Sequence, residues 1–416
     1  MYMASFNARL VRKDIPELRN RQVNNHPLTY LDSAASTLPP DAVIDAMSRY
    51  YQLRHANVHR GVYQTAVEAT EAYENARSRV ARFINAAGPH ELIFTKNTTE
   101  SINLIARSWG ATHLRAGDIV VLSEMEHHAN IIPWLQLKEA LGIELRFIPV
   151  GSDFRLDLST LDELLSGAAL LSITAMSNVL GTKNPVSLLS AAAHQAGALV
   201  AVDAAQSIIH GPTDVKGLDV DFLSFSAHKM LGPTGIGALW VQESVLDSMP
   251  PFLGGGGMIS DVTTTGFTPA AGVARFEAGT PPIAEAAGLD AAIRYLEGLS
   301  MVAVASHDRA LTEHALSQLN SFGDRIHVIG PPNVTERGGV ISLEVVGVHP
   351  HDVTQILDQF GVCARPGHHC AKPLMRRFGL SATTRVSFGP YSLYQDIDVL
   401  IEALGSALQF FEITKK

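Results

Sequence analysis

Cysteine is scarce in this chain, because its 416 residues include only Cys363 and Cys370. Two cysteines cannot form the disulfide framework of a small secreted protein, and they suggest a reducing compartment. A basic excess is also missing, since 32 Lys and Arg residues stand against 41 Asp and Glu residues, for a net charge of −9. An acidic chain without a basic tract gains little from counterion release, so we expect no nucleic acid as the main partner.

Long apolar runs are absent as well. No stretch reaches the roughly 18 apolar residues that a membrane span needs, so we expect no membrane segment. The longest, residues 168–176, is broken by Ser172 and Thr174 and suits a buried strand. The N-terminal bases Arg9, Arg12 and Lys13 are followed at once by acids, and no apolar leader is present. The sequence therefore favours a cytoplasmic protein.

The chain instead alternates short apolar runs with amphipathic stretches, over a length that suits two to three domains. The apolar runs predict strands at 92–94, 119–122, 145–149, 169–174, 199–202, 222–226 and 237–241. Amphipathic helices are predicted between them at 101–109, 132–141 and 188–197. This order is typical of an α/β fold with a mostly parallel seven-stranded sheet covered by helices on both faces.

The pattern changes after residue 250. Residues 250–282 are rich in Gly, Thr and Pro, which predicts a long functional loop or a subunit contact. Helices predicted at 291–299, 302–319, 352–360 and 395–411 then accompany strands at 340–346 and 385–388. We therefore expect a large domain at residues 31–299 and a smaller α+β domain built from 1–30 with 300–416.

Lys229 is the first candidate for chemistry. It follows the apolar run 221–225 in a turn, and glycines stand at 232, 235 and 237. Ligands of open α/β sheets bind at the carboxyl ends of the strands. A lysine desolvated there has a lowered pKa and can attack a carbonyl to form a Schiff base. An isolated lysine in a turn is more often an ordinary surface residue, so the neighbouring motifs decide.

Two of these motifs follow other strands at the same predicted edge. Asp203 ends the run 199–202, where it could hold a protonated pyridine nitrogen or simply cap a helix. Asn97-Thr98-Thr99-Glu100 follows strand 92–94 and opens a helix. The free N–H groups of a helix start suit a phosphate, although an ordinary cap is the alternative.

Histidines and one cysteine supply further candidates. In Glu126-His127-His128-Ala129-Asn130, His127 could stack on a flat cofactor and shuttle protons near neutral pH. A paired-histidine metal site is less favoured, because successive side chains do not converge. In the loop Arg365-Pro366-Gly367-His368-His369-Cys370-Ala371, Cys370 is expected to be exposed with a lowered thiol pKa. A zinc site is the alternative there, but no second distant pair of ligands supports it.

The remaining two candidates are less specific. Cys363 lies in the apolar run 361–364, and we expect it to be buried and inert. Arg385 lies on a short predicted strand, where its guanidinium could clamp a carboxylate bidentately. A surface ion pair is the alternative for this arginine.

Together these motifs resemble one family in order along nearly the whole chain. They include Leu31-Asp32-Ser33-Ala34-Ala35, His59-Arg60-Gly61, Asn97-Thr98-Thr99-Glu100, Glu126-His127-His128-Ala129-Asn130, Ser177-Asn178-Val179-Leu180-Gly181, Asp203-Ala204-Ala205-Gln206, Ser226-Ala227-His228-Lys229, Phe276-Glu277-Ala278-Gly279-Thr280-Pro281 and Gly367-His368-His369-Cys370-Ala371. The sequence is similar to group II cysteine desulfurases, the SufS/CsdA-like branch of the class V aminotransferases. That resemblance implies the fold-type I architecture and the cofactor pyridoxal 5'-phosphate.

The resemblance also implies a role for each matching residue. Lys229 would carry the cofactor as a Schiff base, Asp203 would pair with its pyridine nitrogen, Gln206 with its phenolic oxygen, and His127 would stack on the ring. Thr98, Thr99, Ser226 and His228 would hold the phosphate, with Thr280 reaching in from the second subunit of a homodimer. Ala34, Asn178, Arg365 and Arg385 would form the substrate site, Cys370 would accept sulfur, and no metal is implied.

The implied reaction converts L-cysteine to L-alanine and leaves the sulfur on Cys370 as a persulfide. The sulfur would serve iron–sulfur cluster assembly or other trafficking through a SufE-like or SufU-like acceptor protein, and selenocysteine could also react. Three positions depart from the family pattern, Tyr63, Leu253 and Pro366, and they bear on partner choice more than on the reaction class.

Two alternatives remain at this point. Other class V chemistry, by a C–S lyase, an aminotransferase or an epimerase, needs no thiol. A cofactor-less scaffold for iron–sulfur assembly would instead use Cys370 and His369 as metal ligands.

Overall fold

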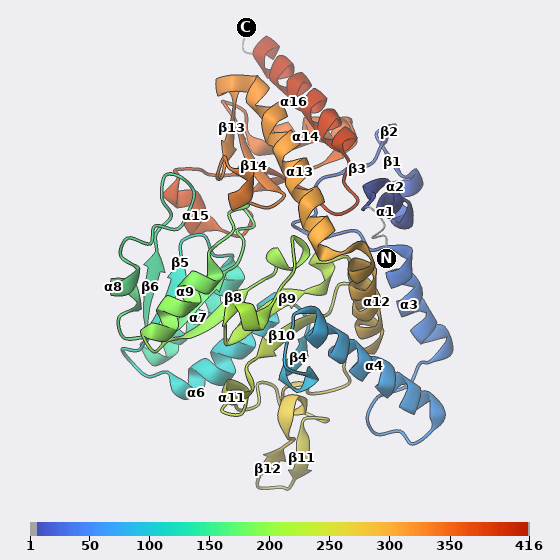
Figure 1. Cartoon of the computed structure of the whole chain (residues 1–416), viewed down its shortest axis with the longest axis vertical. Coiled ribbons are helices and arrows are strands. Elements are labelled where there is room, and N and C mark those ends of the chain that lie inside the picture. Colours follow the sequence, from blue (N-terminus) through green and yellow to red (C-terminus); the bar gives the residue numbers. More distant parts are fainter. Residues whose placement is uncertain (1–5, 415–416) are drawn as a thin grey trace.

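A seven-stranded sheet forms the centre of the molecule in the computed structural model, which describes residues 6–414 (Figure 1). The strand order is β4 (Leu92–Thr95), β10 (Gly237–Val241), β9 (Phe222–Ser226), β8 (Leu199–Asp203), β7 (Ala168–Thr174), β5 (Ile119–Ser123) and β6 (Glu144–Ile148). Only β10 runs antiparallel to its neighbours. The predicted α/β fold with a mostly parallel seven-stranded sheet is therefore confirmed.

Helices cover both faces of this sheet, as the apolar strands require. One core joins the sheet to α4 (Gln64–Phe83), α9 (Val186–Gln195) and α12 (Ile283–Leu299). A second core joins the other face to α5 (Thr98–Leu104), the π-helical turn Ile105–Gly110 and α7 (Ile132–Leu141). The remaining helices of this part are α3 (Asp41–Leu53), α6 (Ala111–His113), α8 (Leu161–Leu165), α10 (Val215–Leu218) and α11 (Glu243–Leu246).

A smaller antiparallel sheet lies above the first in Figure 1, and it carries Arg385 and the strand that leads into the cysteine loop, residues 365–371. Its order is β13 (Ile326–Ile329), β14 (Val340–Val345), β17 (Thr383–Ser387) and β16 (Arg365–Gly367). A third core packs this sheet against α13 (Met301–Leu319), α14 (Pro350–Gln359) and α16 (Tyr394–Thr414), and α15 (Lys372–Arg377) follows the cysteine loop.

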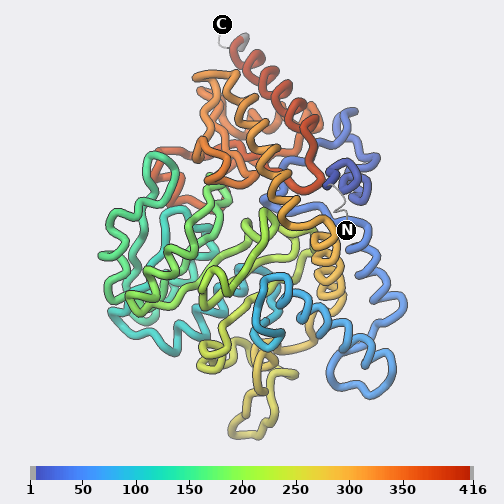
Figure 2. The backbone as a smooth tube through the Cα atoms, in the orientation of Figure 1, coloured from blue at the N-terminus to red at the C-terminus, as the bar shows by residue number. Residues whose placement is uncertain are grey.

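The N-terminal segment packs with this smaller part, where Figure 2 shows the blue start of the chain beside the red C-terminal helix. It forms α1 (Ala8–Asp14), α2 (Pro16–Asn20), the short strands β1 (Gln22–Val23) and β2 (His26–Pro27), and β3 (Thr29–Tyr30). β3 pairs in parallel with β15 (Val362–Cys363). The domain limits at 31–299 and at 1–30 with 300–416 stay a prediction, whose ends, 1–5 and 415–416, lie outside the described residues.

Three local predictions need correction. The segment 250–282 is not a plain loop, because β11 (Ile259–Val262) and β12 (Phe267–Pro269) form a hairpin that projects away from the smaller sheet (Figure 1). The helix predicted at 101–109 starts earlier and changes to π-helical turns at Ile105. Cys363 is half-buried rather than buried, because it lies on the short strand β15.

The helices offer no candidate for a membrane span. Within residues 6–414, none combines the length and the apolar character needed to cross a bilayer.

Candidate active site

The predicted site residues gather at the carboxyl ends of β4, β5, β7, β8 and β9, the edge where open α/β sheets bind ligands. There they line a cavity of about 250 Å³. The predicted residues that line it are Ala34, Thr98, Thr99, His127, Asn178, Asp203, Gln206, Ser226, His228, Lys229, Arg365, Cys370 and Arg385. Of the predicted set, only Thr280 lies elsewhere.

Lys229 ends the 3₁₀ turn Ala227–Lys229, which directly follows β9. The N-terminal segment fixes this turn, because Thr37 donates its backbone N–H to the His228 carbonyl at 2.8 Å and accepts the Leu231 N–H at 2.7 Å. The pKa of Lys229 is lowered to about 8, mainly by burial; Asp203 opposes this shift, and Arg385 and Arg365 add to it. Near neutral pH the neutral, nucleophilic form of this amine is therefore a minor fraction, but a much larger one than for an ordinary lysine.

Asp203 is the other buried charged group on the large-sheet side of the cavity. Its carboxylate accepts the Ala205 N–H at 2.9 Å, the only side-chain hydrogen bond it makes within residues 6–414. Burial raises its pKa, while Ala205 and Lys229 oppose that effect. A buried carboxylate with so few donors fits a cationic partner such as a protonated pyridine nitrogen. Gln206 follows it and donates its amide to the Ala34 carbonyl at 2.8 Å.

The start of α5 meets the end of β9 at the predicted phosphate end. The Ser226 hydroxyl accepts the Thr98 backbone N–H at 2.8 Å and bonds the Thr98 hydroxyl at the same distance. Gly237 makes this approach possible, because a Cβ there would lie 2.6 Å from the Phe225 oxygen and 2.8 Å from Asn97 Cα. The cluster places the hydroxyls of Thr98 and Ser226 at a helix start, where the positive end of the helix dipole favours an anion.

His127 lines the same cavity. Its Nδ1 accepts the Ala129 N–H at 3.1 Å, so the neutral ring carries its proton on Nε2. Burial, helped by Lys229 and His128, lowers its pKa to about 3. In this environment the ring is neutral at pH 7 and does not titrate near neutrality as the sequence suggested.

The cysteine loop is held in an unusual backbone conformation. His369 and Cys370 have φ values of +50° and +56°, a backbone conformation that residues other than glycine adopt only under constraint. The constraint comes from the large sheet, because the His128 N–H binds the Cys370 carbonyl at 2.7 Å and the Asn178 amide binds the His369 carbonyl at 2.7 Å. The Cys370 side chain itself is exposed, as predicted.

Asn178 therefore has a different contact from the one expected. Its side-chain Nδ2 donates to the His369 carbonyl in the cysteine loop. Its backbone carbonyl accepts a hydrogen bond from Nη1 of Arg385 at 3.0 Å. Arg385 is only 3% exposed, and Asp32 accepts its Nη2 at 3.1 Å. Asp32 also accepts Nε of Arg365 at 3.1 Å, so one carboxylate bridges both predicted substrate-binding arginines.

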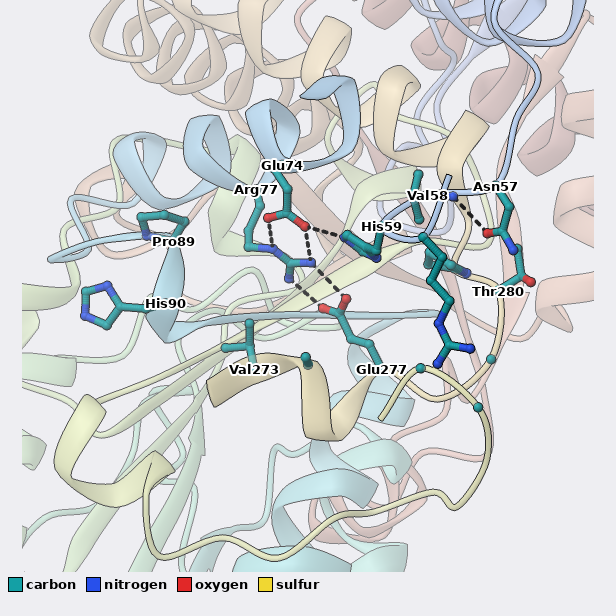
Figure 3. Close-up of a pocket in the computed structure, with 16 residues that line it drawn as sticks. Asn57, Val58, His59, Glu74, Arg77, Pro89, His90, Val273, Glu277 and Thr280 are labelled. Carbon is teal, nitrogen blue, oxygen red and sulfur yellow. Dashed lines mark hydrogen bonds and ion pairs between the residues drawn. The ribbon is translucent and has the colours of Figure 1, made fainter. Parts of the chain in front are cut away.

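Thr280 lies in a separate pocket of about 510 Å³, shown in Figure 3 together with Asn57, Val58 and His59. Beside it, Arg77 forms a buried ion pair with Glu277 at 2.5 Å and a second with Glu74 at 2.9 Å. Within this chain Thr280 does not reach the cavity of Lys229, and its role across a subunit contact stays a prediction.

Four residues that contact the site received no cofactor or substrate role from the sequence, although His128 and His369 were weighed as metal ligands: Asp32, Glu126, His128 and His369. All four stand inside motifs that were recognised. The sequence therefore contained these residues in recognisable places, but it could not show which groups they contact. Glu126 is fully buried and accepts hydrogen bonds from Ser123, Asn130 and the Thr174 N–H, and burial raises its pKa to about 8.

A metal centre finds no support in this geometry. Across residues 6–414, no three His, Cys, Asp or Glu side chains are grouped so that they could hold an ion.

The comparisons with known proteins agree with the site. The class V aminotransferase family matches residues 29–400, and the chain belongs to that family. It is 48% identical to a cysteine desulfurase of Salmonella gallinarum over 96% of this chain and 98% of that protein.

Solved structures give the same result. The cysteine desulfurase of Thermococcus onnurineus is 39% identical, with a TM-score of 0.91 over 96% of this chain and 97% of that one. The cysteine desulfurase CsdA of Escherichia coli is 35% identical, with a TM-score of 0.90 over 98% of this chain and 100% of that one.

The cofactor of this family, pyridoxal phosphate, fits the residues that the cavity presents. The sparsely bonded carboxylate of Asp203 suits its ring nitrogen, and the amine of Lys229 suits its aldehyde. Thr98, Ser226 and their neighbours suit its phosphate. The predicted cofactor is therefore confirmed at the level of the family.

Proposed function

We propose that this protein is a cysteine desulfurase that converts L-cysteine to L-alanine and collects the sulfur on Cys370. The observation that carries the proposal is the exposed Cys370 thiol on the rim of the cavity that also holds Lys229 and Asp203. Transamination, epimerisation and simple elimination need no protein thiol beside the amine. A loop held in a constrained conformation to present one is specific to sulfur transfer.

The proposed reaction balances without an external oxidant. The Cys370 thiolate attacks the substrate sulfur, the bond from that sulfur to Cβ breaks, and a new sulfur–sulfur bond forms on the protein. Cβ takes up a proton, so cysteine leaves as alanine while the transferred sulfur becomes the outer atom of a persulfide. Bound pyridoxal phosphate supplies the electron sink that makes Cα acidic and weakens the Cβ–sulfur bond.

The residues of this chain divide the remaining work. Neutral Lys229 removes the proton from Cα, which its lowered pKa allows at neutral pH. His127 relays a proton from the Lys229 ammonium to Cβ, so that its ring is neutral before and after the step. Arg365 and Arg385 hold the substrate carboxylate, and the contacts of Asn178 keep Arg385 and the cysteine loop together.

Three further assignments belong to the proposal. The active unit is a homodimer in which Thr280 of each chain completes the phosphate site of the other. The persulfide passes to a SufE-like or SufU-like acceptor protein in the cytoplasm. Selenocysteine reacts in the same cavity, because its Cβ–selenium bond is weaker than the Cβ–sulfur bond.

The test follows the sulfur atom by mass spectrometry after incubation with L-cysteine. The wild type and the matched variant Cys363→Ala are expected to gain one sulfur atom at Cys370 and to release alanine. Cys370→Ala is expected to keep the yellow cofactor adduct at Lys229 and to produce alanine only at background level. Alanine formation by Cys370→Ala at the wild-type rate would contradict the proposal. Pyruvate, ammonia and free sulfide as the main products would indicate elimination instead.

A further inference from the structure

The two arginines of the cavity form an unfavourable pair on their own. β16 and β17 are antiparallel neighbours, and Arg365 stands directly opposite Arg385 in their register. Like charges directly opposite each other destabilise such a pair of strands. Both side chains nevertheless line the same cavity, so something must hold the two guanidinium groups together.

Asp32 provides the opposite charge. Its Oδ2 accepts Nε of Arg365 and its Oδ1 accepts Nη2 of Arg385, both at 3.1 Å. The side chain of Asp32 is only 17% exposed, so its attraction is weakly screened by solvent. The backbone also fixes its place, because Asp32 forms a parallel β-bridge with Ser387 on the end of β17.

The bridged pair leaves one positive charge and several donors for a ligand. Two guanidinium groups and one carboxylate sum to a net charge of +1, which matches one carboxylate of an amino acid. The terminal Nη groups of Arg365 have no protein partner among residues 6–414. Nε of Arg385 is buried and likewise lacks a partner within that range. Unpaired guanidinium donors in a partly buried site are strong partners for an anion.

We propose that Asp32 is a positioning residue that holds Arg365 and Arg385 ready for the substrate carboxylate. The proposal rests on the proposed function, since it specifies how that site recognises an amino acid. Without the bridge, the half-exposed Arg365 turns away from Arg385 into solvent. The site then keeps the single clamp of Arg385 and loses the second.

Kinetics with L-cysteine on the intact holoenzyme test this role. Asp32→Asn keeps the side-chain volume and removes the charge, and it is expected to raise KM about tenfold or more, the loss of one charge-assisted hydrogen bond. The value of kcat at saturation should stay within about threefold, because the reacting atoms are not touched. Asp396→Asn is the matched control, since Asp396 pairs with Arg12 away from the cavity, and its KM should not change.

A double-variant cycle separates positioning from a general structural role. If Asp32 acts through Arg365, then Asp32→Asn with Arg365→Gln should have the KM of Arg365→Gln alone. Additive effects, an unchanged KM, or a loss confined to kcat would each overturn the proposal. If Asp32→Asn fails to fold, Asp32→Glu serves instead, because it keeps the charge but moves the carboxylate. An unchanged KM in Asp32→Glu would then count against positioning, whereas a wild type inactive on cysteine would refute only the proposed function.

Discussion

The lowered pKa of Lys229 can be tested by a measurement on the protein without bound cofactor. Burial and the neighbouring charges together move this pKa from 10.5 to about 8, and burial is the largest cause. At pH 7 about one lysine in eleven is then neutral, against about one in three thousand at the ordinary value, a gain of roughly 300-fold in nucleophilic amine. Asp203 holds the pKa up by attraction, so Asp203→Asn should lower it below 8.

A small aldehyde can measure this pKa in cofactor-free protein. Formaldehyde with a mild hydride donor methylates only neutral amines, and it is small enough to enter a cavity of about 250 Å³. The rate at Lys229, followed by peptide mass spectrometry between pH 6 and 10, should rise to half its maximum near pH 8. The exposed Lys96 reports the activity of the reagent in the same sample.

The direction in which the pKa of Lys229 shifts follows from the burial of its amine and from the charges around it. Desolvation disfavours the ammonium form, so the neutral fraction must grow as the pH passes through about 8 rather than 10.5. A rate at Lys229 that is still rising without a plateau at pH 10 in the wild type would refute the argument from burial. A half-maximum that moves upward in Asp203→Asn would refute the assigned attraction between the carboxylate and the amine.

Two further predictions concern the frame of the site. Arg77→Met leaves the buried Glu277 carboxylate without its cation and should cost about 3–5 kcal/mol in denaturant unfolding. Arg155→Met is the control, because Arg155 pairs with Asp153 and Glu336 on the exposed surface, and it should leave the unfolding midpoint almost unchanged. Gly237→Ala forces a Cβ to within 2.6 Å of the Phe225 oxygen and should lower both stability and cofactor affinity. Gly298→Ala, with nothing within 4 Å, should be neutral or stabilising, and equal losses in the two alanine variants would contradict the contact argument.

The strands of the central sheet could be predicted closely because their apolar runs are short and continuous. Phe222–Ser226 and Gly237–Val241 have the predicted bounds, as does the helix Ile132–Leu141, which stops at Gly142 in a left-handed conformation. α4 was not predicted, because much of its buried face consists of small residues such as Ala66, Ala69 and Ala76, which contribute little to hydropathy. The helix is therefore stabilised by its tertiary packing in the core, and no local hydrophobic pattern marks it in the sequence.

The site was predictable in its members but not in its contacts. Motif order was sufficient to collect Lys229, Asp203 and Cys370, because each directly follows or precedes a recognisable element. It could not show that Asp32 bridges two arginines 333 and 353 residues away. Only the pairing of strands brings residues so far apart in the sequence into contact. The hydrogen-bond partners therefore follow from the fold and not from the spacing of motifs.

The position of the thiol depends on both sheets at once. Lys229 and Asp203 belong to the large sheet, whereas Arg365 and Arg385 belong to the smaller one. The cysteine loop follows β16 of the smaller sheet, yet its two left-handed residues, 369 and 370, are held through their carbonyls by groups of the large sheet's loops. A backbone conformation of this kind costs free energy and persists only while its partners stay in place. Under the proposed function, any shift between the two sheets therefore changes the distance from Cys370 to the substrate sulfur.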